Sequence, residues 1–264
     1  MEEMDKGLHG HKHVLSQSLE SIIAVFDKLG FSVVEGPEIE TEHYNFDVLN
    51  IPANHPARDM WDTLWLKLPR SERGSSPDPA KRDLGQNKLL RTHTSPVQAR
   101  FMETHKPPLA IIVPGKVFRH EATDATHEAQ FYQLEGLMVG KDVTLGMMTG
   151  VVRRFFKEFF GSDVKTRIRP SYFPFTEPSV EVDMSCFKCG GEKDSCSVCK
   201  GTGWIEIMGA GMVHPNVLNK VGINPRYFQG FAFGCGVDRL VMLKYGIDDV
   251  RTLYSGDLRL VNQF

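Results

Sequence analysis

The first clear pattern along the chain is a single apolar stripe at helical spacing. Its residues recur at alternating steps of four and three, which places them on one face of a helix. They are Leu15, Leu19, Ile22, Phe26 and Leu29. Gly30 follows at once, and glycine commonly ends a helix because it adopts a left-handed backbone at little steric cost. We therefore predict an amphipathic helix over residues 15–29.

A short β-branched stretch follows this helix. Phe31 to Val34 predicts a strand, and Gly36-Pro37 predicts a turn directly after it. Proline cannot donate a backbone hydrogen bond to a central ladder. We therefore expect this strand at a sheet edge or at a subunit interface.

Five further stretches have the composition of strands, and turn-forming residues mostly separate them. They are Leu109 to Val113, Gln130 to Val139, Val164 to Ile168, Ser179 to Met184 and Trp204 to Met208. Two more stretches have helical periodicity, residues 145–159 and 237–245, and Gly246 ends the second. The pattern predicts an α+β fold in which helices flank an antiparallel sheet, without internal repeats.

Composition restricts the class of protein. The 264 residues are 41% hydrophobic and 24% charged, which disfavours collagen-like, coiled-coil and wholly disordered chains. The formal net charge of -2 gives no general cationic surface for nucleic acid. The longest strongly apolar run, Leu109 to Val113, is too short to cross a bilayer, and the acidic start lacks the features of a signal peptide. We expect a cytosolic protein with no membrane partner.

Residues 67–88 have no apolar period and predict a mobile surface loop.

Four of the five cysteines form two C-x-x-C pairs that are separated by six residues. They are Cys186, Cys189, Cys196 and Cys199. This spacing predicts a tetrahedral zinc site, and four thiolates leave no open coordination position, so the zinc would be structural. An iron–sulfur site is an alternative, although the symmetrical pairs lack ferredoxin spacing, and four reduced thiols in a loop are another. The fifth, Cys235, has no visible base partner and is expected to be a small buried thiol.

A second candidate site surrounds the hydrophilic loop over residues 122–130. The chain has no glycine-rich phosphate loop, so an enzyme acting on nucleotides would hold phosphates with arginine and histidine side chains. If antiparallel strands flank the loop, alternation places Phe131, Gln133 and Glu135 on one face. Arg119 suits a phosphate or carboxylate, Phe131 a stacked base and Glu135 an ammonium group. A solvated sheet face is the alternative explanation of this spacing.

Several segments resemble the motifs of a known family. Arg119 in the string F-R-x-E resembles motif 2 of class II aminoacyl-tRNA synthetases, residues 234–239 resemble motif 3, and Gly36-Pro37 resembles motif 1. Five strings more narrowly resemble the alpha subunits of bacterial phenylalanyl-tRNA synthetases, in matching order between about Leu15 and Leu260. They are residues 45–50, 55–58, 90–95, 124–127 and 230–234.

The resemblance implies one class II synthetase catalytic domain over residues 1–264, with a zinc-binding hairpin inserted at residues 186–199 and without an N-terminal tRNA-binding coiled coil. The family joins L-phenylalanine to ATP, giving phenylalanyl-adenylate and pyrophosphate, and transfers the phenylalanyl group to the 3′-terminal adenosine of tRNA(Phe). The implied partner is a beta subunit that holds the editing centre, in an α2β2 heterotetramer.

The resemblance also implies roles for individual residues by matching positions. Arg119 and Arg239 are the expected catalytic cations. The expected ATP-binding residues are Arg119, Glu121, His127, Phe131 and Arg239. The expected phenylalanine-binding residues are Trp65, His93, Ser95, Gln133, Glu135, Phe173, Phe175, Ala232 and Gly234. Mg2+ is expected with ATP, bound mainly by phosphates, and Glu177 is the candidate protein ligand.

Two alternatives to this function remain. One is a freestanding paralogue that adenylates an amino acid for an acceptor other than tRNA. The other is an inactive scaffold of the same fold. Arg119, Glu121 and Arg239 are all present, which argues against a scaffold because a scaffold has no need of these charges.

Overall fold

A seven-stranded sheet forms the centre of the computed structural model, which describes residues 10, 12–58, 63–67, 87–161, 164–190, 195–196 and 198–264. Its strands are β1 (Ser32–Val33), β4 (Leu109–Phe118), β5 (Gln130–Gly140), β6 (Thr166–Phe173), β7 (Thr176–Ser185), β8 (Trp204–Val213) and β9 (Gln229–Gly236). Their order across the sheet is β1-β4-β5-β9-β8-β7-β6. All neighbours are antiparallel except β1, which pairs with β4 in parallel at the edge of the sheet.

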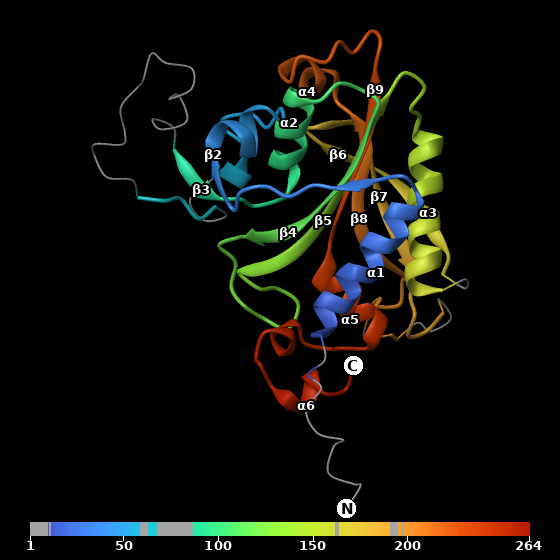
Figure 1. The fold of residues 1–264 in the computed structure, drawn as a ribbon. Helices are drawn as coiled ribbons and strands as arrows, with labels where there is room; N and C mark the ends of the chain where they lie inside the picture. The colour runs from blue at the N-terminus through green and yellow to red at the C-terminus, as the bar shows by residue number, and fades with distance from the viewer. Residues whose placement is uncertain are drawn as a thin grey trace, which may run out of the picture.

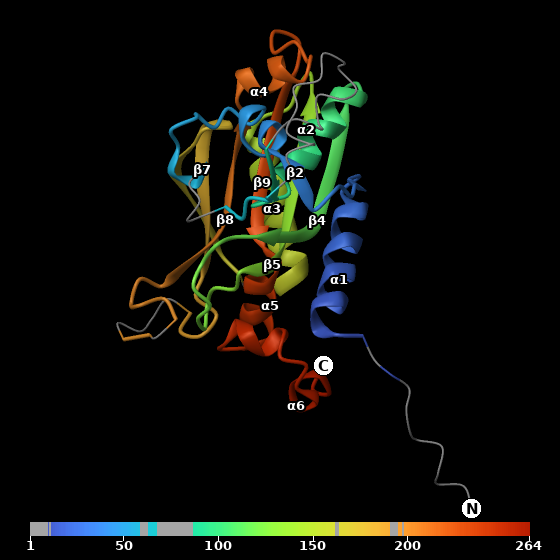
Figure 2. The same cartoon turned by 90° about the vertical axis from the view of Figure 1, so that its left-hand side faces the viewer.

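Helices cover both faces of this sheet, and Figure 1 shows α1 and α3 side by side on one of them. The helices are α1 (Val14–Lys28), α2 (Ser95–Thr104), α3 (Leu145–Phe160), α4 (Pro215–Lys220), α5 (Val237–Tyr245) and α6 (Leu258–Val261). Single turns occur at His43–Asp47, Pro56–Arg58 and Val250–Leu253. A small second sheet pairs β2 (Ile39–Thr41) with β3 (Lys88–Leu90), beside α2 (Figure 2).

The pleat of the large sheet divides its apolar residues between two cores. Ile112 and Leu134 face the core formed with α1, α3 and α5. Val113 and Leu137 face the other core, which α2 and α4 complete. Successive side chains of a strand alternate between faces, so Glu135 lies on the same face as Leu137, toward α2. This face carries the candidate site.

An aromatic cluster joins α1 to the sheet. The ring of Phe26 stacks on Phe233 of β9 with 5.5 Å between centroids and 19° between planes, and it lies 4.9 Å from Phe155 of α3. Gly136 of β5 is the register partner of Phe233, and a β-carbon at Gly136 would collide with the Phe233 ring. The absent side chain thus makes room for the aromatic cluster.

The structure confirms most of the predicted elements. Three helices lie where the apolar periods placed them, and Gly30 and Gly246 follow two of them with φ of 80° and 69°. The first predicted strand does lie at the sheet edge. The sheet is not purely antiparallel, because β1 runs parallel to β4. The predicted loop falls mostly on residues 68–86, which lie outside the described residues.

Several elements have no counterpart in the prediction, namely α2, α4, α6, β2, β3 and β9. In β9, glycine or alanine alternates with phenylalanine or cysteine, and glycine at three of its eight positions is not typical of a strand. In the described part of the chain, no helix combines the length and the apolar character needed to span a membrane.

Candidate active site

The centre of the candidate site is a buried carboxylate that α2 and β5 bring together. Ser95 Oγ, at the start of α2, donates a hydrogen bond of 2.6 Å to Oε2 of Glu135 on β5. One helical turn later, Gln98 Nε2 donates to the same oxygen at 2.9 Å. Burial raises the pKa of Glu135 to about 7, although hydrogen bonds from the Ser95 hydroxyl and from the backbone of Thr94 and Ser95, with the nearby charge of Arg119, oppose the rise. Glu135 is therefore poised between its neutral and ionised forms.

Two further residues of the predicted site present buried polar atoms. Oε1 of Gln133, on the same strand as Glu135, is buried and has no hydrogen-bond partner in the described part of the chain. Both ring nitrogens of His93 are buried as well. Burial, together with the positive charge of Arg119, lowers the pKa of His93 to about 3, so its ring is neutral. A buried carbonyl oxygen without a donor is costly, and a ligand with N–H groups would satisfy it.

A row of small residues forms the floor beside Glu135. Glu135 on β5 is the register partner of Gly234 on β9, and Gly234 is the partner of Gly209 on β8. A β-carbon at Gly234 would lie 3.0 Å from Cγ of Glu135, and one at Gly209 would lie 2.9 Å from the ring of Phe173. Neighbouring strands are about 4.8 Å apart, so the row spans roughly 10 Å between Glu135 and Gly209. A carboxylate marks one end of the row and an aromatic ring the other.

Aromatic side chains form the wall at the second end. The rings of Phe173 and Phe175 are nearly parallel, with 5.8 Å between centroids and 11° between planes. Trp65 and Phe175 pack against one small apolar cluster, and Phe175 and Ala232 both pack against the core beneath α2 and α4. The structure therefore brings Trp65, Phe175 and Ala232 to one side of the site.

The first of the residues expected to bind ATP lies just after the end of β4. The guanidinium carbon of Arg119 lies 5.1 Å from the centroid of the Phe131 ring, and Arg119 Nε donates to the Thr92 carbonyl oxygen at 3.2 Å. The backbone N–H of Arg119 donates to Ala129 O at 2.9 Å, which closes the loop between β4 and β5. Arg119 and Phe131 thus share the mouth of the loop.

Inside this loop an aspartate organises His127. The carboxylate of Asp124 accepts hydrogen bonds from the backbone N–H groups of Thr126 and His127, at 2.6 and 2.9 Å. It also lies 3.0 Å from Nδ1 of His127. These donors hold the pKa of Asp124 well below its ordinary value. The arrangement fixes the orientation of the His127 ring within the loop.

Three predicted residues lie at the surface. Glu121 is exposed in the loop, and Arg239 is exposed in the first turn of α5, directly after β9. Glu177 is 74% exposed in its side chain, and its Oε2 lies 3.3 Å from Nε2 of His214. Their roles toward ATP and magnesium stay predictions.

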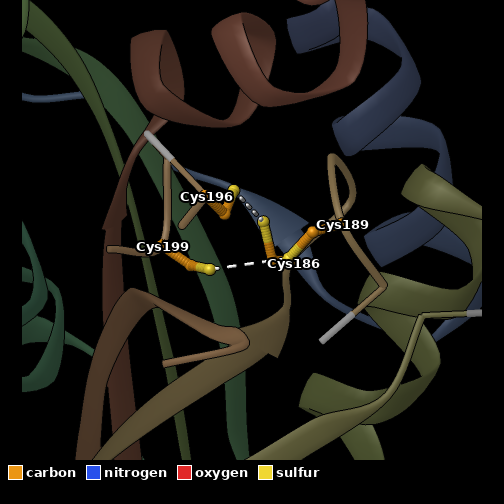
Figure 3. Close-up of side chains that lie close together, drawn as sticks. All are labelled: Cys186, Cys189, Cys196 and Cys199. Carbon is orange, nitrogen blue, oxygen red and sulfur yellow. Dashed lines mark hydrogen bonds between the residues drawn. The ribbon is translucent and has the colours of Figure 1, made fainter. Parts of the chain in front are cut away.

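The four paired cysteines converge on one point, as Figure 3 shows. Their sulfur atoms all lie within 4.8 Å of one another, with 3.8 Å between Cys186 and Cys196 and 3.6 Å between Cys189 and Cys199. Zinc–sulfur bonds of about 2.3 Å in a tetrahedron place the sulfur atoms about 3.8 Å apart. Backbone N–H groups of residues 198 and 199 lower the pKa of Cys196 to about 6, whereas burial raises the pKa of Cys186 to about 12. A bound metal ion would hold all four cysteines as thiolates. This geometry fits a metal ion bound by four thiolates.

Comparison with known proteins places the chain in a family. The model described as "tRNA synthetases class II core domain (F)" matches residues 3–264. The phenylalanine–tRNA ligase alpha subunit of Alkaliphilus metalliredigens is 52% identical over 255 residues, which cover 97% of this chain and 69% of that protein. The corresponding subunit of Enterococcus faecalis is 54% identical over 258 residues, covering 97% and 68%. The chain belongs to the phenylalanine–tRNA ligase alpha-subunit family.

A solved structure supports the fold of this family member independently. The pyrrolysyl-tRNA synthetase from Desulfitobacterium hafniense superposes with a TM-score of 0.64, covering 93% of this chain and 75% of that one. At 17% identity the match shows a shared fold alone. The chain contains the core domain of an enzyme of the class II synthetases. Enzymes of this class use ATP with Mg2+.

Sequence reasoning missed two residues that organise the site of this alpha-subunit family member. Gln98, like Ser95, donates a hydrogen bond to Glu135. Residues three apart lie on the same face of a helix, so a helix beginning at Ser95 would have indicated Gln98. Asp238 is buried at the start of α5, accepts a 2.7 Å hydrogen bond from the backbone N–H of Tyr132 and accepts another from the Tyr254 hydroxyl. Nothing in the local sequence pairs Asp238 with residues 106 positions earlier.

Proposed function

We propose that this chain is the catalytic alpha chain of a phenylalanine–tRNA ligase. It activates L-phenylalanine with ATP to phenylalanyl-adenylate, releasing pyrophosphate, and transfers the phenylalanyl group to the 3′-terminal adenosine of tRNA(Phe). The observation that carries this proposal is the row from Glu135 through two glycines to Phe173, because it pairs an ammonium acceptor with an aromatic wall in a family of phenylalanine–tRNA ligases.

The amino acid fits this row in one orientation. Its ammonium group would meet the Glu135 carboxylate and the unpartnered Oε1 of Gln133. Ser95 and His93 would complete this polar end, and Gly234 leaves room for the backbone of the substrate. The phenyl ring would lie against Phe173 and Phe175, where edge-to-face contacts between rings are favourable. Trp65 and Ala232 would close the pocket around it.

Adenylation joins two anions, because the substrate carboxylate attacks the α-phosphate of ATP. Positive groups that are already in place lower the barrier to such a reaction. Arg119 would hold the carboxylate and the α-phosphate, and His127 with Arg239 would hold the outer phosphates. Phe131 would stack on the adenine, and Glu121 would accept a hydrogen bond from the adenine amino group.

Magnesium would be bound mainly by the phosphates of ATP, with Glu177 as its candidate protein ligand. The ion neutralises phosphate charge when it is bound. The donor set fits, because a carboxylate oxygen is the type of ligand that magnesium prefers and the Glu177 side chain is 74% exposed. His214 Nδ1 accepts from the backbone N–H of Asn216 at 3.0 Å, so the neutral ring carries its proton on Nε2, toward Glu177. His214 thereby orients the carboxylate.

The partners follow from the same family. We infer a beta subunit, an α2β2 heterotetramer and tRNA(Phe) as the acceptor. An apolar pocket discriminates against an added hydroxyl only by roughly 100-fold, so tyrosine would also be activated and editing would fall to the partner.

The decisive experiment for the reaction is ATP–pyrophosphate exchange with each amino acid in turn. We expect exchange that depends on phenylalanine, with tyrosine a weaker substrate. Charging of tRNA(Phe), with and without the beta subunit, then separates a ligase from a paralogue that serves another acceptor. Exchange without preference for phenylalanine would contradict the proposal.

We further propose that the four cysteines bind one zinc ion that stabilises the hairpin inserted between β7 and β8. Elemental analysis of the purified protein should give one zinc per chain, and Cys196→Ser should release most of it. Because the four cysteines pack against the core on the other face of the sheet from Glu135, metal loss should lower the melting temperature more than it changes the KM for phenylalanine. Cys235→Ser is the matched control, and it should retain the zinc. Iron, or no metal, in the wild-type protein would refute the assignment.

A further inference from the structure

Asn50 has an unusual backbone for a residue that is not glycine. Its φ of 61° lies in the left-handed region, which asparagine tolerates better than most residues do. Its neighbours Leu49 and Ile51 are buried in one small apolar cluster, so both sides of Asn50 are fixed by packing. Such conformations cost energy, and they persist where the surrounding structure holds them in place.

The side chain of Asn50 reaches a segment 124 positions away. Its Nδ2 donates a 2.8 Å hydrogen bond to the carbonyl oxygen of Pro174. From the other side, Asn216 Nδ2 donates to Oδ1 of Asn50 at 3.3 Å. A carbonyl oxygen only accepts hydrogen bonds, so the amide nitrogen must face Pro174. The two contacts together define the orientation of the Asn50 amide.

Pro174 lies in the turn between β6 and β7, between the two aromatic residues of the pocket wall. Two other backbone groups beside Pro174 are also held. The N–H of Phe173 donates to Ser179 Oγ at 3.0 Å, and the N–H of His214 donates to the carbonyl of Phe175 at 2.9 Å. Asn50 holds the Pro174 carbonyl between them. The positions of both rings therefore depend on a residue from the first quarter of the chain.

We propose that Asn50 is a specificity-positioning residue for the amino-acid pocket. It acts through the turn: by holding the Pro174 carbonyl, it keeps the Phe173 and Phe175 rings 5.8 Å apart and nearly parallel, and so sets the width of the pocket. Asparagine suits the position because it combines tolerance of a left-handed backbone with an amide donor. Glycine offers the same backbone without the donor. The inference rests on the proposed function, since it takes these rings to line the phenylalanine pocket.

Glycine and asparagine both tolerate a left-handed backbone, so replacing Asn50 with glycine tests the role of the amide by itself. Asn50→Gly keeps the left-handed backbone available and removes only the amide, so it separates the hydrogen bond from backbone strain. Asn50→Asp keeps the shape of the side chain but replaces the donor with acceptors. Asn262→Gly is the matched control, because Asn262 is exposed at the end of α6, at the opposite end of the molecule from α4 (Figure 1).

Two measurements test the proposal. In ATP–pyrophosphate exchange, Asn50→Gly and Asn50→Asp should raise the KM for phenylalanine roughly tenfold and lower the preference for phenylalanine over tyrosine, while the KM for ATP stays near wild type. In hydrogen–deuterium exchange, the peptide covering residues 171–177 should exchange faster in both variants. The Asn262→Gly control should match wild type in both measurements.

The outcomes separate the two proposals. Unchanged hydrogen exchange at residues 171–177 in folded Asn50→Gly would overturn the anchoring, whatever the amino acid substrate is. Equal loss of affinity for phenylalanine and ATP, with unaltered preference over tyrosine, would overturn the role in specificity. A wild-type enzyme without phenylalanine-dependent exchange would refute the proposed function instead, and hydrogen exchange would still decide whether Asn50 holds the turn.

Discussion

At the scale of single residues, Glu135 shows how a buried group acquires a function. The Glu135 residue is 5% exposed, and its two side-chain donors, Ser95 and Gln98, converge on one carboxylate oxygen. Burial favours the neutral acid, whereas the Ser95 hydroxyl, the backbone of Thr94 and Ser95, and the charge of Arg119 favour the ion. A carboxylate balanced in this way ionises fully when a positive ligand arrives, so binding of an ammonium group should release a proton.

The balance at Glu135 predicts that affinity for phenylalanine depends on pH. The acid is protonated below its pKa of about 7 and cannot pair with an ammonium group, and it is ionised above that value. The dissociation constant should therefore fall roughly tenfold between about pH 6 and about pH 8. His93, with a pKa of about 3, stays neutral throughout. Calorimetry at both pH values measures the change, and Glu135→Gln should abolish it. Affinity that does not vary with pH in the wild type would contradict this role.

Ala232 gives a second prediction at this scale, because the proposed pocket would meet only its single methyl group. Ala232→Gly should admit phenylalanine analogues that carry a para substituent, and pyrophosphate exchange with para-chlorophenylalanine measures this. Ala210→Gly is the matched control, since Ala210 packs in the core on the other face of the sheet. It should leave selectivity unchanged. Equal use of the analogue by wild type and Ala232→Gly would show that Ala232 does not limit the pocket.

At the scale of elements, the local sequence predicted the positions of helices better than it predicted the contacts that form the site. The helices α1, α3 and α5 have apolar stripes that face a core, and each was found near its predicted bounds. The helix α2 was missed because its buried residues include Ser95 and Gln98, which serve Glu135 and not an apolar core. A helix that buries polar groups for function lacks the period from which helices are predicted.

The candidate site shows the same limit. Alternation along β5 placed Gln133 and Glu135 correctly on one face, because it is a local property of a strand. Ser95 was assigned only through resemblance to the family, and the structure puts its hydroxyl against Glu135. Asn50 and Asp238 contact partners 124 and 106 positions away, so no local pattern could reveal them.

Replacing a glycine with alanine should have opposite effects on stability at two positions, one in β5 and one in α3. Gly136→Ala should destabilise the protein by about 1–3 kcal/mol, because the new methyl group would collide with the buried Phe233 ring. Gly150→Ala, inside α3, should stabilise it by about 0.5–1 kcal/mol, because no described atom outside the helix's own backbone lies within 4 Å of the new β-carbon and alanine favours the helix. Urea unfolding measures both changes. A Gly136→Ala variant as stable as the wild type would show that the packing around Phe233 is not as described, and a destabilised Gly150→Ala variant would contradict the prediction for α3.

At the scale of the whole molecule, the site is assembled from distant parts of the chain. The first half supplies α2, the centre supplies β5 and its loop, and the C-terminal segment closes the loop from outside. The backbone N–H of Val250 donates to Ala125 O at 2.9 Å, and Tyr254 donates to the buried Asp238 carboxylate. Asp238 in turn accepts from Tyr132, which lies between Phe131 and Gln133. Stability and ATP binding should therefore be linked through Asp238.

Tyr254→Phe tests this link. Burial raises the pKa of Asp238, and the Tyr254 hydroxyl opposes the rise, so removing the hydroxyl should raise that pKa further. At neutral pH the variant should lose about 1–3 kcal/mol of unfolding free energy, because a buried carboxylate loses a donor.

The sign of the effect with pH follows from the same pKa. A carboxyl whose folded pKa is raised costs stability as pH rises through that value, so the loss should shrink in acid, where Asp238 is protonated in both proteins. The KM for ATP should also rise. Asp238 orders Tyr132, which follows Phe131 in the chain, and Asp238 itself precedes Arg239. Phe131 and Arg239 are the residues proposed to bind ATP. Tyr245→Phe, the same change at the end of α5, is the control and should match wild type. A loss that is equal at all pH values, with an unchanged KM for ATP, would mean that Tyr254 contributes packing and does not order the site.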